Sequence, residues 1–146
     1  MYPNTDNAID ELQAIVGNCT DIVAAGQGTQ RLTDLCHGLA KLSGWWSNKD
    51  GSPKTAEQVN IGEKLMLIVS EVAEGMEGHR KDLMDDKLPH RKMLEVELAD
   101  ALIRIHDLAG WLGLDLAGAV MEKLAFNQKR PDHKPENRYA EGGKAY

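Results

Sequence analysis

Two pairs of acidic residues are the side chains in this sequence best suited to chemistry. Glu71 and Glu74 are three residues apart, and so are Glu97 and Asp100. Residues at i and i+3 lie on one face of a helix, so each pair can present two carboxylates side by side. The residues around both pairs are largely apolar, namely Leu67, Ile68, Val72, Ala73, Leu94, Val96, Leu98, Ala99 and Ile103. Carboxylates near a packed core repel one another and lose hydration unless a positive charge lies between them.

Two kinds of positive charge can meet this need. Mg²⁺ and Mn²⁺ are hard cations that prefer carboxylates, waters and substrate phosphates as ligands. Basic side chains are the alternative, and Lys64, Lys81, Arg91 and Arg104 are available for ordinary salt bridges. A single E-x-x-E spacing is typical of a solvated helix face, whereas two such pairs on consecutive helices favour a metal site. The spacing alone leaves both interpretations open.

Helices are the elements that must position these acids, because apolar residues recur at helical spacing through most of the chain. No stretch of useful length alternates as a strand does, so we expect an all-α fold. The third and fourth helices should form a central hairpin joined by a turn at Asp85–Pro89, since proline disfavours helical geometry in the residue before it. The expected helices run from Thr5 or Asp6 to a break at Gly26-Gln27-Gly28, from Thr29 to Leu42, from about Thr55 to Leu83, from about His90 to Leu112, and from Asp115 to about Lys129. Residues 132–146 are expected to form a polar, extended tail.

The length, charge and composition of the chain exclude several classes of function. A chain of 146 residues fits one domain, and a formal charge of −6 argues against a protein that binds nucleic-acid polymers by neutralising phosphates. No apolar run approaches the ~20 residues that a membrane helix needs. Cys19 and Cys36 are isolated, which suits two small core residues in a reduced, cytoplasmic protein. The acidic N-terminus does not look like a signal peptide.

The order E-x-x-E, 22 residues (75–96), E-x-x-D resembles the signature of MazG-type all-α nucleoside triphosphate pyrophosphohydrolases. The resemblance covers about residues 29–144. It extends to five further stretches, which are Asn60–Leu65, Ser70-Glu71, Asp85–Arg91, Glu95–Ala101 and Glu122–Arg130. It implies a four-helix-bundle core in residues 29–131, an extra N-terminal helix in residues 1–28, and the tail in residues 132–146. It also implies a homodimer or homotetramer in which facing subunits complete each site.

The resemblance further implies the reaction. Glu71, Glu74, Glu97 and Asp100 become ligands of Mg²⁺ or Mn²⁺, which holds a triphosphate and activates a water. The substrate would be a nucleoside triphosphate, with a deoxynucleotide favoured, cut to its monophosphate and pyrophosphate for nucleotide-pool control. That control could remove damaged nucleotides or deplete one normal dNTP, and the sequence does not decide between them.

Several residues are candidates for substrate contacts. By the resemblance, Lys123, Asn127 and Arg130 would contact phosphates and sugar. The alternative for Lys123 and Arg130 is a solvated helix end. Lys64 lies two turns before Glu71 and could reach a phosphate, although a lone lysine is more often a surface residue.

The base-binding candidates precede the acids in the chain. His37 and Trp46 are similar to the pair that frames the base in related deoxycytidine-triphosphate pyrophosphatases, with Trp45 as an alternative ring and Trp46 as an alternative core residue. Asn60, at the mouth of the third helix, is a candidate substrate-side donor. Residues expected to be structural are Arg104 and Asp107 as a salt bridge supporting the ligands, Trp111 and Met121 in the core, and His79, His90, His106 and His133 at the surface or at caps.

Three rival functions remain open at this point. A dUTP-type diphosphatase and a phosphoribosyl-ATP pyrophosphatase share the helical carboxylate scheme. A helical oligomer whose acids serve salt bridges or a regulatory metal is the non-enzymatic alternative.

Overall fold

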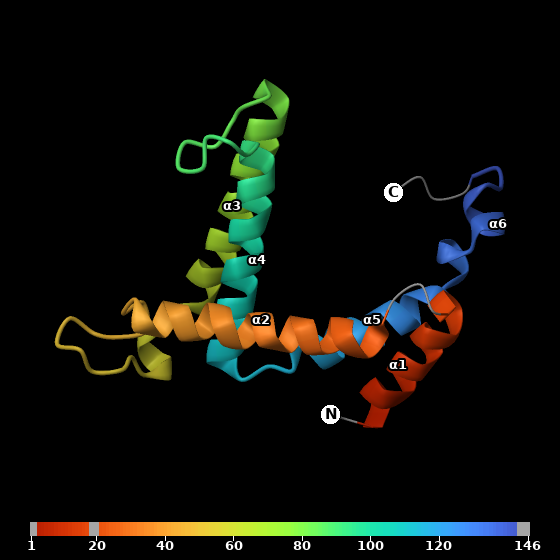
Figure 1. The fold of residues 1–146 in the computed structure, drawn as a ribbon, viewed down its shortest axis with the longest axis horizontal. Coiled ribbons are helices and arrows are strands. Elements are labelled where there is room, and N and C mark those ends of the chain that lie inside the picture. Colours follow the sequence, from red (N-terminus) through yellow and green to blue (C-terminus); the bar gives the residue numbers. More distant parts are fainter. Residues whose placement is uncertain (1–2, 18–20, 143–146) are drawn as a thin grey trace. The chain divides into compact units, whose positions relative to one another are not determined.

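The computed structural model describes residues 3–17 and 21–142 of the chain, and Cys19 lies outside these residues. The described residues are mostly helical (Figure 1) and form no β-strand, only isolated bridges at Ser47–Pro53 and Met84–Lys92. The α-helices are α1 (Pro3–Val16), α2 (Ile22–Leu42), α3 (Ile61–Lys81), α4 (Met93–Leu112), α5 (Leu116–Lys129) and α6 (Pro135–Arg138). Short 3-10 helices lie at Ala56–Gln58 and Pro131–His133. The prediction of an all-α chain is confirmed.

The boundary between the first two helices differs from the expected one. α1 ends at Val16 and is followed by Gly17 at a φ of +60°, a conformation that favours glycine. α2 begins at Ile22, where the Asp21 carboxylate accepts a hydrogen bond of 2.9 Å from the Ala24 amide. The helix then continues through residues 26–28, so the predicted break there is wrong. A glycine inside a helix costs only about 1 kcal/mol, and Gly26 is buried against Met121.

The chain forms two compact units, Met1–Arg31 with Asp115–Tyr146, and Leu32–Leu114. In the first unit α1 packs against α5. The sequence had instead placed α5 in the predicted core of residues 29–131. Its apolar core consists of Ala8, Ile9, Leu12, Ile22, Met121 and Ala125. Met121 is therefore a core residue, as predicted. Thr5 is almost fully buried and donates a hydrogen bond of 2.7 Å to Glu122.

The segment after α5 is not the extended tail that its polar composition suggested. Pro131 and Pro135 stand at the start of a 3-10 helix and of α6, respectively. Proline favours the first turn of a helix because its fixed φ is helical and because an amide hydrogen at that position would have no acceptor within the helix. The expectation of an extended chain is thus wrong for residues 132–138.

In the second unit α3 and α4 run side by side as a hairpin (Figure 1). The predicted turn between them is confirmed. Asp85 is buried there, and its carboxylate accepts hydrogen bonds from the backbone amides of Lys87 (3.0 Å) and Leu88 (2.5 Å). Asp82, with a φ of 53°, ends α3 in the left-handed conformation.

Glycines let the two helices of the hairpin approach closely. Gly75 and Gly78 are buried on α3 one turn apart. A Cβ atom on Gly78 would lie 2.8 Å from Met93, and one on Gly75 would lie 3.3 Å from the Cβ of Glu97. The absence of side chains at these positions therefore sets the distance at which α4 presents Glu97 to α3.

The second half of α2 contacts α4 in the same unit. Thr33 and His106 are both buried, and Thr33 Oγ1 lies 2.8 Å from His106 Nδ1. Burial lowers the pKa of His106, and the prediction that this histidine lies at the surface or at a cap is wrong. Cys36 is buried, as predicted. A search of the described residues finds no helix with the length and apolar character needed to span a membrane.

Candidate metal centre

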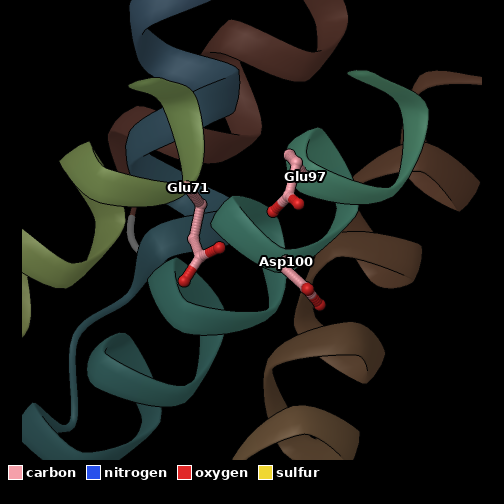
Figure 2. Close-up of side chains that lie close together, drawn as sticks. All are labelled: Glu71, Glu97 and Asp100. Atoms are coloured by element: carbon pink, nitrogen blue, oxygen red, sulfur yellow. The ribbon is translucent and has the colours of Figure 1, made fainter. Parts of the chain in front are cut away.

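Three of the four predicted ligands lie together between α3 and α4. Glu71 comes from α3, and Glu97 and Asp100 come from α4 (Figure 2). One carboxylate oxygen from each residue can be chosen such that all three atoms lie within 4.8 Å of one another. Glu71 and Glu97 are each 7% exposed, whereas Asp100 is exposed. The carboxylate cluster, as we call these three residues, therefore has a buried floor and a solvent-facing rim.

Helix geometry explains why the fourth acid stands apart. Glu71, Gly75 and Gly78 are spaced by four and three residues and form the buried face of α3. Glu74 directly precedes Gly75 and therefore points away from that buried face. Its side chain is exposed and is not part of the cluster. It nevertheless contributes to the repulsion that raises the pKa of Glu97.

The cluster carries more negative charge than its surroundings neutralise. Burial raises the pKa of Glu97 to about 7, and the hydrogen bond with Glu71 and repulsion by Glu74, Glu71 and Asp100 add to this effect. Asp100 is exposed but partly desolvated, and this partial desolvation raises its pKa, together with repulsion by Glu71 and Asp85, while Arg104 acts in the opposite direction. A divalent cation would remove both costs, because it is the counter-charge that such oxygens bind best.

A single basic side chain reaches this cluster among the ion pairs of the described residues. Arg104 Nε and Nη2 each lie 2.6 Å from Glu71 Oε1. Arg104 is one of the four basic residues that the sequence offers for such a pair, and it lies one turn after Asp100 on α4. The predicted salt bridge between Arg104 and Asp107 is replaced by this contact with Glu71.

The donor set fits Mg²⁺ or Mn²⁺. All three residues offer carboxylate oxygens, the ligands that hard divalent cations prefer, and none offers sulfur or imidazole. The exposed rim at Asp100 would leave room for waters or phosphate oxygens, which Mg²⁺ retains in most protein sites. The site therefore matches a substrate-binding metal better than a closed structural one.

A second polar cluster in this unit gathers three of the predicted substrate residues. His37 Nδ1 lies 2.9 Å from Asp107 Oδ1, and Trp46 Nε1 donates a hydrogen bond of 2.7 Å to the same oxygen. The Lys64 ammonium lies 4.8 Å from the centroid of the Trp46 ring. Asp107 is thus the residue that joins His37 to Trp46, a role that its sequence position did not reveal.

The rings of this cluster are already stacked on one another. Trp46 and Trp111 are nearly parallel, with an interplanar angle of 8° and centroids 4.3 Å apart. Trp46 is only 3% exposed and Trp45 is 66% exposed. In this arrangement Trp45 is the ring that solvent can reach, while Trp46 packs as a core side chain.

Three of the four other predicted substrate residues have local partners. Asn60 caps α3, where its side chain accepts a hydrogen bond of 3.1 Å from the Glu63 amide. Lys123 lies over the Phe126 ring, Arg130 pairs with Asp132, and the Asn127 side-chain oxygen is buried without a hydrogen-bond partner. Lys123, Asn127 and Arg130 belong to the first compact unit, whereas the carboxylate cluster belongs to the second.

Neither a scan against protein-family models nor searches of curated proteins and of solved structures found a match to this chain.

Proposed function

We propose that this chain is a nucleoside triphosphate pyrophosphohydrolase of the MazG type that works with Mg²⁺ or Mn²⁺. The observation that carries the proposal is the carboxylate cluster, in which Glu71, Glu97 and Asp100 bring oxygens within 4.8 Å of one another. The raised pKa of Glu97 supports it, because this arrangement is unfavourable until a cation is present.

The four acids fall into two pairs with different tasks in this proposal. Glu71 and Glu97 provide buried oxygens that hold the ion in one place, and the packing of α3 on α4 at Gly75 fixes their separation. Asp100 and the exposed Glu74 face the solvent side, from which a triphosphate would approach. When bound, the divalent ion neutralises phosphate charge and lowers the pKa of a coordinated water. The scheme requires no serine or cysteine nucleophile.

The sequence predicted a four-helix core within residues 29–131 of one chain, and we propose instead that two copies of the chain build this core. The α3–α4 hairpin supplies two helices, and many of its large apolar side chains are about half exposed or more, including Leu65, Met66, Val69, Val72 and Met76 on α3 and Leu98, Leu102 and Ile103 on α4. Monomers rarely leave so many apolar side chains together in water. A homodimer, or a homotetramer made of two dimers, would cover them.

Pyrophosphate release is the decisive assay. We expect turnover with Mg²⁺ or Mn²⁺ on at least one of the standard deoxynucleoside or ribonucleoside triphosphates, and loss of turnover in excess chelator. Chromatography should show the monophosphate as the first nucleotide product, since the resemblance implies cleavage after the α-phosphate. A nucleoside diphosphate as first product, or full turnover in metal-free protein, would exclude the proposed reaction.

The same assay separates the rival functions. A dUTP-type diphosphatase would act on dUTP in preference to the other nucleotides, and a phosphoribosyl-ATP pyrophosphatase would act on phosphoribosyl-ATP alone. The ion pair between Arg104 and Glu71 is the observation that favours a non-enzymatic oligomer. That alternative would give no turnover with any of these substrates, although the protein would still bind Mn²⁺ if its metal were regulatory.

A further inference from the structure

Arg104 is the one cation that touches the carboxylate cluster through an ion pair in the described part of the chain. Two of its nitrogens, Nε and Nη2, approach the same atom, Oε1 of Glu71, at 2.6 Å. The contact joins α4 to α3 across 33 residues of sequence. An ionised carboxylate that is buried needs such a partner, because its charge is costly to leave alone.

The two partners differ in their access to solvent. The Glu71 side chain is 9% exposed, whereas that of Arg104 is 42% exposed. The arginine therefore reaches the buried oxygen from the solvent side. It can leave this oxygen without disturbing the packed core, but Glu71 cannot follow it.

We propose that Arg104 is a resident counter-ion that competes with the divalent metal for Glu71 and turns to the triphosphate once the metal has replaced it. This inference rests on the proposed function and names a regulator of the same site. A divalent ion is the stronger partner for a buried carboxylate, and it also neutralises Glu97 and Asp100, which Arg104 does not contact in an ion pair. A guanidinium is in turn well suited to bind phosphate oxygens through two parallel hydrogen bonds.

The position of Arg104 on α4 keeps it beside the site after release. It lies four residues after Asp100 and seven after Glu97, so all three residues share one face of the helix. A rotation of its side chain is enough to move the guanidinium from Glu71 to a ligand held at the exposed rim. The exchange therefore couples metal loading to the appearance of a phosphate-binding group.

A purely supporting role for Arg104 makes the opposite prediction. Partners of metal ligands often orient a carboxylate while the metal binds its other oxygen, and their loss weakens metal affinity. Competition means that the loss of Arg104 strengthens metal affinity. The sign of the change therefore distinguishes the two roles.

The experiment measures Mn²⁺ binding by calorimetry on the full-length protein without nucleotide, followed by binding of inorganic tripolyphosphate to the Mn²⁺-loaded protein. The variants are Arg104→Met and, as a second neutral substitution, Arg104→Gln. The matched control is Arg91→Met. Arg91 lies just before α4, and its ion pair with Glu95 is exposed and lies outside the cluster. Circular dichroism confirms that each variant is folded.

We expect both neutral variants to bind Mn²⁺ about tenfold more tightly than the parent, the order expected for removing one charge near a divalent ion in partly solvated surroundings. Tripolyphosphate affinity should fall at least about tenfold in the same variants. The control should match the parent in both measurements. A merely structural role would not produce these opposite changes.

Mn²⁺ affinity that is unchanged or weaker in the neutral variants overturns the inference, and so does tripolyphosphate affinity that does not fall. In either case Mn²⁺ binding by the parent leaves the proposed function standing. If neither the parent nor the neutral variants bind Mn²⁺, the metal site itself is refuted and both proposals fail together.

Discussion

Replacing Glu97 with glutamine should stabilise the metal-free protein, and only above a defined pH. Glu97 is 7% exposed, and burial followed by contact with neighbouring acids raises its pKa from 4.5 to about 7. A pKa shift of this size means that ionised Glu97 lowers the free energy of unfolding by about 3 kcal/mol. Glutamine has nearly the same shape, carries no charge, and can still donate a hydrogen bond to Glu71.

The direction of the pH dependence follows from proton binding. Below about pH 4.5 the Glu97 carboxyl is protonated in both states and costs nothing. Between about pH 4.5 and 7 the folded protein keeps a proton that the unfolded chain has lost, so the free energy of unfolding falls as the pH rises. Above about pH 7 the whole penalty is present. The difference between E97Q and the parent should therefore grow from near zero to about 3 kcal/mol across this window.

Urea unfolding in the presence of chelator, at fixed ionic strength and fixed protein concentration, measures this difference. Glu95→Gln is the matched control, because it makes the same change on an exposed side chain of the same helix. Its effect should stay within about 0.5 kcal/mol and should not follow the window. Saturating Mg²⁺ should stabilise the parent more than E97Q. A difference curve for E97Q that is flat with pH would refute the electrostatic account of the cluster.

Further substitutions address the site and the hairpin. Asp100→Ala should lower turnover at saturating Mg²⁺ by orders of magnitude while the metal-free protein melts at the same or a higher temperature, because Asp100 is repelled by Glu71. Glu74→Ala should also lower turnover and leave the metal-free protein at least as stable, because Glu74 is exposed and adds to the repulsion at Glu97. A variant that melts well below the parent and turns over normally would make these acids structural. Gly78→Ala should destabilise the protein by about 1–3 kcal/mol in urea unfolding, because the new Cβ would lie 2.8 Å from Met93. Gly38→Ala in α2 meets nothing within 4 Å and should be neutral or stabilising by up to about 1 kcal/mol, so equal effects at the two glycines would contradict the close approach of α3 and α4.

The sequence predicted the site well where local geometry decides the outcome. The i, i+3 spacing of Glu97 and Asp100 keeps both on one face of α4, and the turn containing Asp85 returns the chain so that α4 lies against α3. These features depend on helical periodicity and turn chemistry, which neighbouring residues determine. The same spacing could not show that Glu71 faces α4 while Glu74 faces solvent, because that choice depends on how the two helices are rotated against each other.

Contacts between residues far apart in the chain could not be predicted from sequence patterns. The break after α1 occurs at Gly17, although residues 26–28 carry the stronger composition signal, because Gly26 is supported by packing against Met121. His106 is buried, and its ring nitrogen lies within hydrogen-bond distance of Thr33, which is 73 residues earlier in the chain. Single-residue preferences amount to about 1 kcal/mol and are readily outweighed by such tertiary contacts.

The exposed apolar side chains of α3 lead to a final prediction about assembly. Leu65, Val69, Val72 and Met76 are each more than half exposed and are spaced by four, three and four residues, so they form one continuous stripe along the helix. Burying this stripe against a second copy would remove apolar surface from water, and a charge placed within it would then be costly. Val72→Glu should therefore weaken self-association at least about tenfold by multi-angle light scattering over a concentration series. Val23→Glu is the matched control, because Val23 is exposed to a similar degree and lies in the other compact unit. An active parent that is monomeric throughout the series, or a V72E variant with the mass of the parent throughout, would show that this stripe is not the dimer interface.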